Sequence, residues 1–167
     1  KILVYGYEGC EPVECLGTID VLRRAEFDVT LLGQTETIKM AHGVNVIPDK
    51  VGKADDLYDC FVITGGKGWA NAQKDAYARE LTEKHIKAGK VVCAICAAPA
   101  VCLAHWGLID GKAATCFPGK EDMMTKCKFS EDRVVVDGNL ITARGAGVSL
   151  EFGLAIVEKL GGNAKKL

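Results

Sequence analysis

The sequence has little surplus charge of either sign and no long hydrophobic run. Its 167 residues include 21 Lys and Arg against 22 Asp and Glu, which leaves a net charge of -1. This balance gives no electrostatic reason to expect a nucleic acid or an anionic membrane as a partner. No apolar run approaches the length that spans a bilayer, and no signal peptide precedes the first predicted strand. We therefore expect a cytoplasmic protein that binds neither nucleic acid nor a membrane.

Paired metal-binding motifs are also missing, although the chain contains 8 cysteines. A zinc site would need a second paired motif, so we expect neither a metal nor a cofactor. The chain is long enough to bury its own core without disulfides, and several cysteines lie in apolar segments, so reduced thiols are expected. Cys93-x-x-Cys96 resembles a redox dithiol. However, Cys93 falls inside a predicted strand instead of at the start of a helix, which disfavours that function.

What the sequence does contain is an alternation of apolar strands and amphipathic helices. This alternation is typical of βαβ units, and Asp137-Gly138-Asn139 predicts the turn of an antiparallel hairpin. We expect one α/β domain over residues 1–167, with a mostly parallel sheet and helices on both of its faces. The predicted strands cover residues 2–5, 27–32, 44–47, 60–64, 91–95, 113–117, 133–136 and 140–142, and the longer predicted helices cover 12–25, 74–88 and 148–160.

One cysteine stands at a predicted corner between a buried strand and a helix. Residues 91–95 are apolar and partly β-branched, and Pro99 suits the first turn of a helix. Cys96 lies between them, with Ala94 and Ala98 two positions away on either side, as in a cysteine counterpart of the G-x-S-x-G nucleophile elbow. The N–H groups and dipole at a helix start favour a thiolate. We expect Cys96 to be a nucleophile, and the competing interpretation is a small buried core residue.

Glycine-containing loops follow other predicted strands. Residues 6–12 follow the first strand, Gly65-Gly66 follow residues 60–64, and Arg144-Gly145 follow the last strand. None of them matches a phosphate loop or a dinucleotide-binding fingerprint. In a parallel α/β sheet, ligands bind beyond the carboxyl ends of the strands. These loops therefore predict a pocket around Cys96.

Six stretches, which run in order through nearly the whole chain, carry a resemblance to a known family. They are Glu14 with Asp20–Ala25, Ile63–Gly66, Ala94–Pro99, Leu103–His105, Thr142–Gly145 and Glu151–Val157. Through them the sequence resembles the ThiJ/PfpI superfamily, and within it the branch of DJ-one and YajL-type proteins. The resemblance implies a flavodoxin-like three-layer sandwich of the class I glutamine amidotransferase type. It also implies a homodimer, because many relatives are homodimers.

The resemblance also implies roles for individual residues. Cys96 matches the reactive cysteine of the family, and Glu14 matches the glutamate of the first helix whose carboxyl group meets that sulfur. Gly66 and Ala97 match the N–H donors of an oxyanion hole. A carboxyl group in a dry pocket beside a thiolate is pushed towards its protonated form, so that it can donate a hydrogen bond or move a proton. Without the resemblance, Glu14 would be taken for a solvated helix residue.

Departures from the family patterns narrow the expected activity. PfpI-type peptidases carry a histidine directly after the nucleophile, where this sequence has Ala97. Glutamine amidotransferases need a late His-x-Glu pair, and no histidine follows His105. We therefore expect neither activity. The DJ-one branch has a histidine before the proline that follows the elbow helix. Phe117 takes that place before Pro118, so an imidazole partner for Cys96 is missing, and the expected pocket is lined by Gly65, Phe117 and Arg144.

The other histidines are expected away from the chemistry. His105 falls on the apolar side of the elbow helix, which favours a core position. His42 and His85 are expected at the surface.

The activity that the resemblance implies is that of a glyoxalase or protein deglycase. Cys96 would attack a small reactive aldehyde such as methylglyoxal, or a glycated protein, and Glu14 would move the proton that leads to lactate. The competing prediction is a non-enzymatic oxidative-stress sensor or redox-regulated chaperone, in which Cys96 is oxidised to a sulfinate. A third interpretation is a binding module whose cysteine is vestigial. The residues alone do not separate these three.

Overall fold

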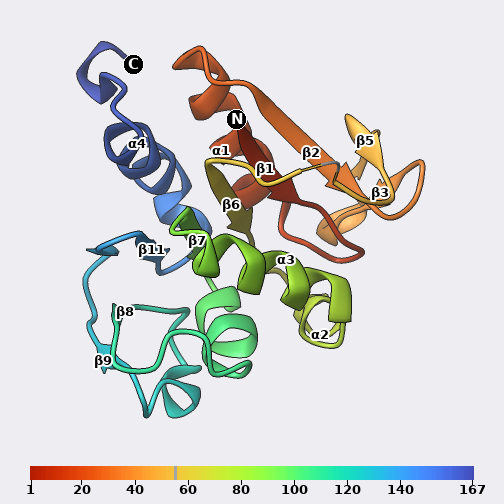
Figure 1. The fold of residues 1–167 in the computed structure, drawn as a ribbon. Coiled ribbons are helices and arrows are strands. Elements are labelled where there is room, and N and C mark those ends of the chain that lie inside the picture. The colour runs from red at the N-terminus through yellow and green to blue at the C-terminus, as the bar shows by residue number, and fades with distance from the viewer. Residues whose placement is uncertain (55) are drawn as a thin grey trace.

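A seven-stranded sheet forms the centre of the protein in a computed structural model, which describes residues 1–54 and 56–167 (Figure 1). Its strands are β1 (Ile2–Tyr5), β2 (Val29–Gly33), β5 (Lys50–Val51), β6 (Cys60–Ile63), β7 (Val91–Ile95), β10 (Val134–Asp137) and β11 (Leu140–Ala143). Their order across the sheet is β10-β11-β7-β6-β1-β2-β5. All neighbouring strands pair in parallel except β10 and β11, which form the predicted antiparallel hairpin.

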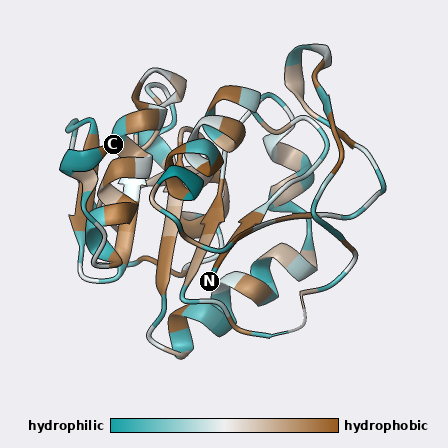
Figure 2. Cartoon of the chain, turned by 90° about the horizontal axis from the view of Figure 1, so that it is seen from above, coloured by the Kyte–Doolittle hydropathy of each residue, from teal (hydrophilic) through white to brown (hydrophobic). Residues whose placement is uncertain are grey.

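Helices cover both faces of this sheet. On one face, α1 (Pro12–Arg24) and α4 (Ser149–Lys159) pack against each other. The other face carries α2 (Trp69–Gln73), α3 (Ala76–Lys87) and a π-helical turn (Pro99–Ala104). Figure 2 shows the apolar strands in the middle of the molecule, between helices that carry hydrophilic residues on their outer sides. This arrangement is the predicted α/β sandwich with a mostly parallel sheet.

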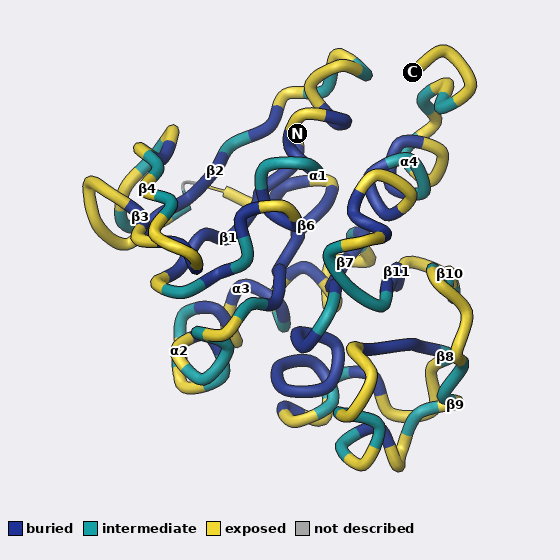
Figure 3. The backbone as a smooth tube through the Cα atoms, turned by 180° about the vertical axis from the view of Figure 1, so that it is seen from behind, coloured by how far each residue is buried: buried dark blue, intermediate teal, exposed yellow. Residues whose placement is uncertain are grey.

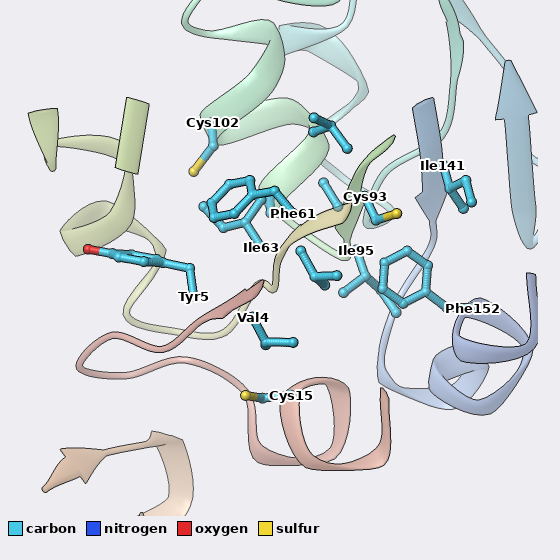
Figure 4. Packing of buried hydrophobic residues seen from close by; sticks show 14 of the residues in the cluster. Val4, Tyr5, Cys15, Phe61, Ile63, Cys93, Ile95, Cys102, Ile141 and Phe152 are labelled. Carbon is cyan, nitrogen blue, oxygen red and sulfur yellow. The ribbon is translucent and has the colours of Figure 1, made fainter. Parts of the chain in front are cut away.

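The two faces of the sheet build two halves of the core (Figure 4). Side chains alternate along a strand, so Val4 and Ile95 point to the side of α1 and α4, where Phe152 packs against them. Tyr5 and Phe61 point to the opposite side, which carries α2, α3 and the π-helical turn. All five side chains are fully buried. A strand covered on both sides needs apolar residues at successive positions, and this need explains the continuous apolar runs in the sequence.

Capping residues set the starts of the longer helices. The side chain of Glu11 caps α1, and Pro12 follows as the first helical residue, where its missing N–H costs no hydrogen bond. Asp75 caps α3 in the same way, so the helix predicted over residues 74–88 begins only at Ala76. Within the described ranges, none of the helices has the length and apolar character needed to cross a membrane.

Short elements lie outside the main sheet. β3 (Ile38–Lys39) pairs with β4 (Asn45–Val46), and β8 (Ala113–Ala114) pairs with β9 (Lys128–Phe129). Figure 3 shows exposed and intermediate residues over much of these segments, in contrast to the buried central strands. The strands predicted over residues 44–47 and 113–117 are therefore present but shorter than expected. Single 3-10 turns occur at Ala41–Gly43, Glu121–Met123, Ala146–Val148 and Ala164–Lys166.

Candidate active site

The carboxyl ends of β1, β6 and β7 meet at one edge of the sheet. β1 has β2 on one side and β6 on the other, so the loops after β1 and β6 leave the sheet where its connections diverge, which is the usual ligand position in such sheets. The two loops are joined by hydrogen bonds from the N–H of Gly68 to the carbonyl of Gly9 (3.0 Å) and from the N–H of Glu11 to the carbonyl of Gly65 (2.8 Å). A Cβ atom on Gly9 would lie 2.5 Å from the Cα atom of Gly68. This close approach is possible only between glycines.

Cys96 follows β7 directly and stands at the same edge. Its φ angle of 64° is left-handed, a conformation that costs about 1 kcal/mol or more in a residue with a side chain. The N–H of Cys96 donates to the carbonyl of Ala143 (2.9 Å), and its carbonyl accepts from the N–H of Phe117 (2.7 Å). Gly65 lies against this turn, because a Cβ atom there would be 3.2 Å from the Cys96 sulfur. The partly buried thiol thus has the strained geometry of a nucleophile elbow.

The helix expected after Cys96 is a π-helical turn of 6 residues, Pro99–Ala104. The N–H of His105 donates to the carbonyl of Ala100, five residues back (3.1 Å), and the N–H of Leu108 donates to that of Leu103 (3.0 Å). A turn this short aligns few peptide dipoles, so it contributes little to the stability of a thiolate.

Glu14 projects from the first turn of α1 and is fully buried. Its Oε2 accepts a 2.9 Å hydrogen bond from the N–H of Gly65, and its carboxyl group also hydrogen-bonds the thiol of Cys96. Its Oε1 is buried with no hydrogen-bond partner in the described part of the chain. Burial raises the pKa of Glu14 to about 7, although the bonds from Cys96 and Gly65 oppose that shift. A carboxyl group with this pKa can either accept or donate a proton at neutral pH.

The thiol of Cys96 is not acidified as expected. Burial raises its pKa, and the negative charge of the neighbouring Glu14 raises it further. The N–H of Ala97 at the helix start does lower the pKa of Cys96, as the sequence predicts, but burial and Glu14 outweigh this effect. A charged Glu14 disfavours the thiolate of Cys96, whereas the thiol favours the charged carboxylate, so the pair keeps one proton, on sulfur, above about pH 7. Transfer of that proton from Cys96 to Glu14 creates a thiolate without adding a second charge, and the N–H of Ala97 hydrogen-bonds the sulfur.

The expected oxyanion donors are Gly66, which directly follows Gly65, and Ala97, which directly follows Cys96. Gly66 has a φ angle of 126°, and a Cβ atom there would lie 2.4 Å from the carbonyl oxygen of Gly9, so no other residue fits. Across residues 1–54 and 56–167, neither amide donates to a backbone carbonyl. Both N–H groups are thus left for a ligand or for the sulfur.

Phe117 and Arg144 line an open groove of about 490 Å³ together with Pro118, Glu131, Arg133, Gly145, Ala146, Gly147 and Val148. Cys96 and Gly65 are not among its lining residues, so the three expected pocket residues do not form one cavity wall. The side chain of Arg144 is fixed by an ion pair with Glu121 (3.8 Å). Phe117 is 45% exposed.

A second cavity, of about 370 Å³, lies near the amino ends of β7 and β11, away from Cys96. It is lined by apolar residues such as Val92 and Leu140, with Lys90 and Lys112 as its charged groups, and it has no thiol, carboxyl or imidazole group. This cavity therefore offers no nucleophile or acid–base group of the kind found beside Cys96.

Two of the three expectations for the histidines are wrong. His85 is fully buried in α3, where its Nδ1 lies 2.7 Å from the carbonyl of Leu81 and its Nε2 accepts the N–H of Tyr58 at 3.1 Å. Burial lowers its pKa. His105 is exposed instead of buried. His42 is exposed as expected, and its Nε2 lies 4.0 Å from Glu11 Oε1.

The other cysteines offer no redox pair with Cys96. Cys93 is fully buried, and its sulfur lies 3.6 Å from that of Cys60 on the adjacent strand. All eight cysteines are free thiols. Over the two described ranges, no group of three or more His, Cys, Asp or Glu side chains is arranged to hold a metal ion.

Tyr7 is a neighbour of the site that the sequence analysis did not single out. Its hydroxyl lies 2.6 Å from the carbonyl oxygen of Thr64 and 2.9 Å from that of Gly65. The only signal for it was its place in the loop after the first strand.

Comparison with known proteins gives a consistent result. The model of the DJ-1/PfpI family matches residues 1–159. The chain is 38% identical over 164 residues to protein dj-1beta of Drosophila melanogaster, which covers 94% of this chain and 87% of that protein. It is 36% identical over 163 residues to the glutathione-independent glyoxalase DJR-1.2 of Caenorhabditis elegans, with 95% and 87% covered. Identity to protein DJ-1 homolog B of Arabidopsis thaliana is 40% over 172 residues, but the chain spans only 39% of that protein.

Solved structures agree with these relatives. The crystal structure of Drosophila melanogaster DJ-1beta matches with a TM-score of 0.92 and 37% identity, over 98% of this chain and 91% of the other. Oxidised Toxoplasma gondii DJ-1 matches with a TM-score of 0.92 and 34% identity, over 99% and 94%. The expected three-layer sandwich is thereby confirmed. With a family match over residues 1–159 and a relative 38% identical that is covered over 87% of its length, this chain belongs to the DJ-1/PfpI family.

Proposed function

We propose that this protein is a cysteine-dependent glyoxalase, which converts a 2-oxoaldehyde such as methylglyoxal into a 2-hydroxy acid such as lactate. The observation that carries the proposal is the buried Glu14 carboxyl group on the Cys96 thiol, with a pKa of about 7. A relative named as a glutathione-independent glyoxalase, 36% identical to this chain, supports the choice of substrate.

In the first step, Glu14 accepts the thiol proton and the Cys96 sulfur attacks the aldehyde carbon. The new carbon–sulfur bond turns the aldehyde oxygen into an oxyanion. The N–H groups of Gly66 and Ala97 are the proposed donors to that oxygen, where each donor stabilises developing charge. The oxyanion then takes the proton back from Glu14, which gives a hemithioacetal on Cys96 and leaves Glu14 as a carboxylate again.

In the second step, Glu14 moves a proton between adjacent carbons. The aldehyde carbon loses its hydrogen as a proton to Glu14, and the neighbouring keto carbon gains one. The hydroxyl proton of the hemithioacetal passes to the keto oxygen, which leaves a 2-hydroxy thioester on Cys96. Water then attacks the thioester carbon, the carbon–sulfur bond breaks, and the 2-hydroxy acid leaves. The sum is the addition of one water molecule to the 2-oxoaldehyde, so no external oxidant or reductant is needed.

The same attack would serve a protein deglycase. A glycated amine carries the aldehyde carbon of the 2-oxoaldehyde, and release of the amine would leave the same group on Cys96. The partly exposed position of Cys96 favours access for such a substrate.

Lactate formation from methylglyoxal tests the proposal. Cys96→Ala and Glu14→Gln should each abolish turnover, whereas Cys127→Ala should retain the wild-type rate. Cys127 is a suitable control because its thiol is also partly buried and donates a hydrogen bond to the carbonyl of Ile109. Wild-type protein that forms no lactate, or a Cys96→Ala variant that still forms it, would contradict the glyoxalase proposal.

A redox sensor or redox-regulated chaperone is the second candidate function. It is favoured by the absence, among the described residues, of any histidine within hydrogen-bond distance of Cys96. In this proposal, peroxide oxidises the thiolate to a sulfinate, which accepts hydrogen bonds from Glu14 and the nearby amides. Intact-protein mass spectrometry after dilute peroxide should show the gain of two oxygen atoms, and the gain should disappear in Cys96→Ala. Oxidation spread evenly over several cysteines would argue against a sensor.

A further inference from the structure

A tyrosine hydroxyl contacts the backbone of Gly65, the residue whose N–H binds Glu14. Tyr7 lies in the loop after β1, and its ring is stacked on that of Tyr5 with centroids 6.1 Å apart. The side chain is only 6% exposed, but its hydroxyl is fully paired, at 2.6 Å from the carbonyl oxygen of Thr64 and 2.9 Å from that of Gly65. One hydroxyl proton is thus shared between two successive carbonyl groups.

The contact with Tyr7 also fixes the direction of the N–H groups in the segment 64–66, which we call the glycine strip. In a planar trans peptide, the carbonyl of one residue points opposite to the N–H of the next. The carbonyls of Thr64 and Gly65 both point to Tyr7, so the N–H groups of Gly65 and Gly66 both point away from it. The first of these N–H groups meets Glu14 Oε2 at 2.9 Å. The second points to the same side of the strip and is the candidate oxyanion donor.

The peptide that carries the Gly66 N–H is held from two directions. Its carbonyl oxygen, on Gly65, accepts both the Tyr7 hydroxyl and the N–H of Glu11 at 2.8 Å. Rotation of that peptide would break both bonds inside the protein, where an unpaired polar group is costly. Successive N–H groups that point the same way form a concave site for an anion. Of these two N–H groups, that of Gly65 is occupied by Glu14, whereas that of Gly66 remains open.

We propose that Tyr7 is a positioning residue, whose hydroxyl fixes the Gly65–Gly66 peptide so that the Gly66 N–H faces the oxygen formed when Cys96 attacks a carbonyl. This inference rests on the proposed glyoxalase function for its kinetic consequence only. The orientation of the amide is a property of the protein without substrate. Burial also raises the pKa of Tyr7, so the hydroxyl stays protonated and keeps donating over the pH range in which the enzyme would work.

The matched pair of variants is Tyr7→Phe and Tyr5→Phe. Both remove one buried hydroxyl and retain the ring, but the hydroxyl of Tyr5 bonds Asp75 at the start of α3 instead of the glycine strip. Loss of one oxyanion donor costs a factor of about 100 to 1,000 in kcat, so a donor that is only loosened should cost about tenfold. We expect Tyr7→Phe to lower kcat for methylglyoxal about tenfold with little change in KM. Tyr5→Phe should keep the wild-type kcat, even if its melting temperature falls by as much as that of Tyr7→Phe.

A measurement without turnover separates this inference from the proposed function. In ¹⁵N-labelled protein, the Gly66 amide signal should shift and exchange faster with solvent in Tyr7→Phe, and should stay unchanged in Tyr5→Phe. If wild-type protein forms no lactate but Gly66 shows this difference, the glyoxalase proposal fails and the positioning role stands. If the Gly66 signal is the same in Tyr7→Phe and wild type, the positioning role is overturned whatever the kinetics show.

The wild-type protein supplies a second readout should Tyr7→Phe fail to fold. Alkylation of Cys96 with iodoacetamide places a carbonyl group beside the sulfur. A Gly66 N–H that faces this space should shift more than the amide of Gly68, which is bonded to the carbonyl of Gly9. Equal, small shifts at Gly66 and Gly68 would overturn the inference.

Discussion

The N–H of Phe117 donates a 2.7 Å hydrogen bond to the carbonyl oxygen of Cys96. The residue that occupies the place of the branch's histidine therefore contacts the elbow through its backbone, while its ring is 45% exposed and lies in an open groove. The side chain at this position can change without disturbing the hydrogen bond that fixes the reactive cysteine.

An imidazole introduced at this position should accelerate turnover. Proton transfer by a positioned side chain contributes a factor of about 100 to 10,000, and a histidine that is not yet optimally placed should give about tenfold. We expect Phe117→His to raise kcat/KM for methylglyoxal near neutral pH, with Phe117→Leu as the control for loss of the ring. Equal rates in the three proteins would show that an imidazole at this position takes no part.

The shared proton of Glu14 and Cys96 predicts the pH dependence of catalysis. The reactive form of the pair has lost one proton, and the group that loses it first is Glu14, with a pKa of about 7. The value of kcat/KM should therefore rise with pH through about 7 and level off above it. In Glu14→Gln, whatever residual rate remains should lack this step. A wild-type profile that is flat between about pH 6 and 8 would contradict the assignment.

The same buried carboxyl group should lower stability at high pH. Its pKa is about 7 in the folded protein against 4.5 for an ordinary glutamate, so the unfolded chain releases this proton more readily. The stabilising protonated form is therefore fully present below about pH 4.5 and is lost as the pH rises through 7. Relative to wild type, Glu14→Gln should gain stability between pH 5 and 8, with a limit of order 3 kcal/mol. Urea unfolding at both pH values measures this difference, and a gap that does not widen would refute it.

His85 should produce the opposite trend. Burial lowers the pKa of this imidazole, so the unfolded chain binds its proton more readily than the folded protein does. The contribution to stability is present above the unfolded pKa of about 6.5 and is lost as the pH falls below it. In His85→Gln this acid-linked loss should be absent. The variant should still be less stable at pH 7.5, by about 1–3 kcal/mol, because the Tyr58 N–H loses its acceptor. Thermal melts from pH 5 to 7.5 would compare the two slopes.

The family resemblance further predicts a homodimer. Light scattering coupled to size-exclusion chromatography should give twice the chain mass of 17.8 kDa. A mass of one chain at micromolar concentration would contradict this expectation.

Local patterns predicted the elbow because its causes are local. Small residues around Cys96, an apolar strand before it and Pro99 after it are all visible in the sequence, and they define the turn. The burial of Glu14 depends on a segment far away in the sequence. Its carboxyl group accepts a hydrogen bond from the N–H of Gly65, in the loop after β6. Only the resemblance could indicate it.

The predicted positions of His85 and His105 were wrong for a similar reason. Whether an imidazole is buried depends on partners that reach it from elsewhere, and His85 gains the N–H of Tyr58 from a segment 27 residues away. His105 ends a π-helical turn, whose wider winding places it on a different side from that of an ideal α-helix. The order of strands and helices was predictable because it depends on the spacing of apolar residues over a whole segment. The unexpected position of a single side chain does not change that spacing.

The contact between Gly9 and Gly68 has a consequence for how this protein can evolve. A Cβ atom on Gly68 would lie 2.3 Å from the carbonyl oxygen of Glu8, and one on Gly9 would lie 2.5 Å from the Cα atom of Gly68. Neither glycine can be exchanged while the opposing backbone stays in place. Both positions should therefore stay glycine through descent unless one loop moves away from the other, even though they lie 59 positions apart in the chain.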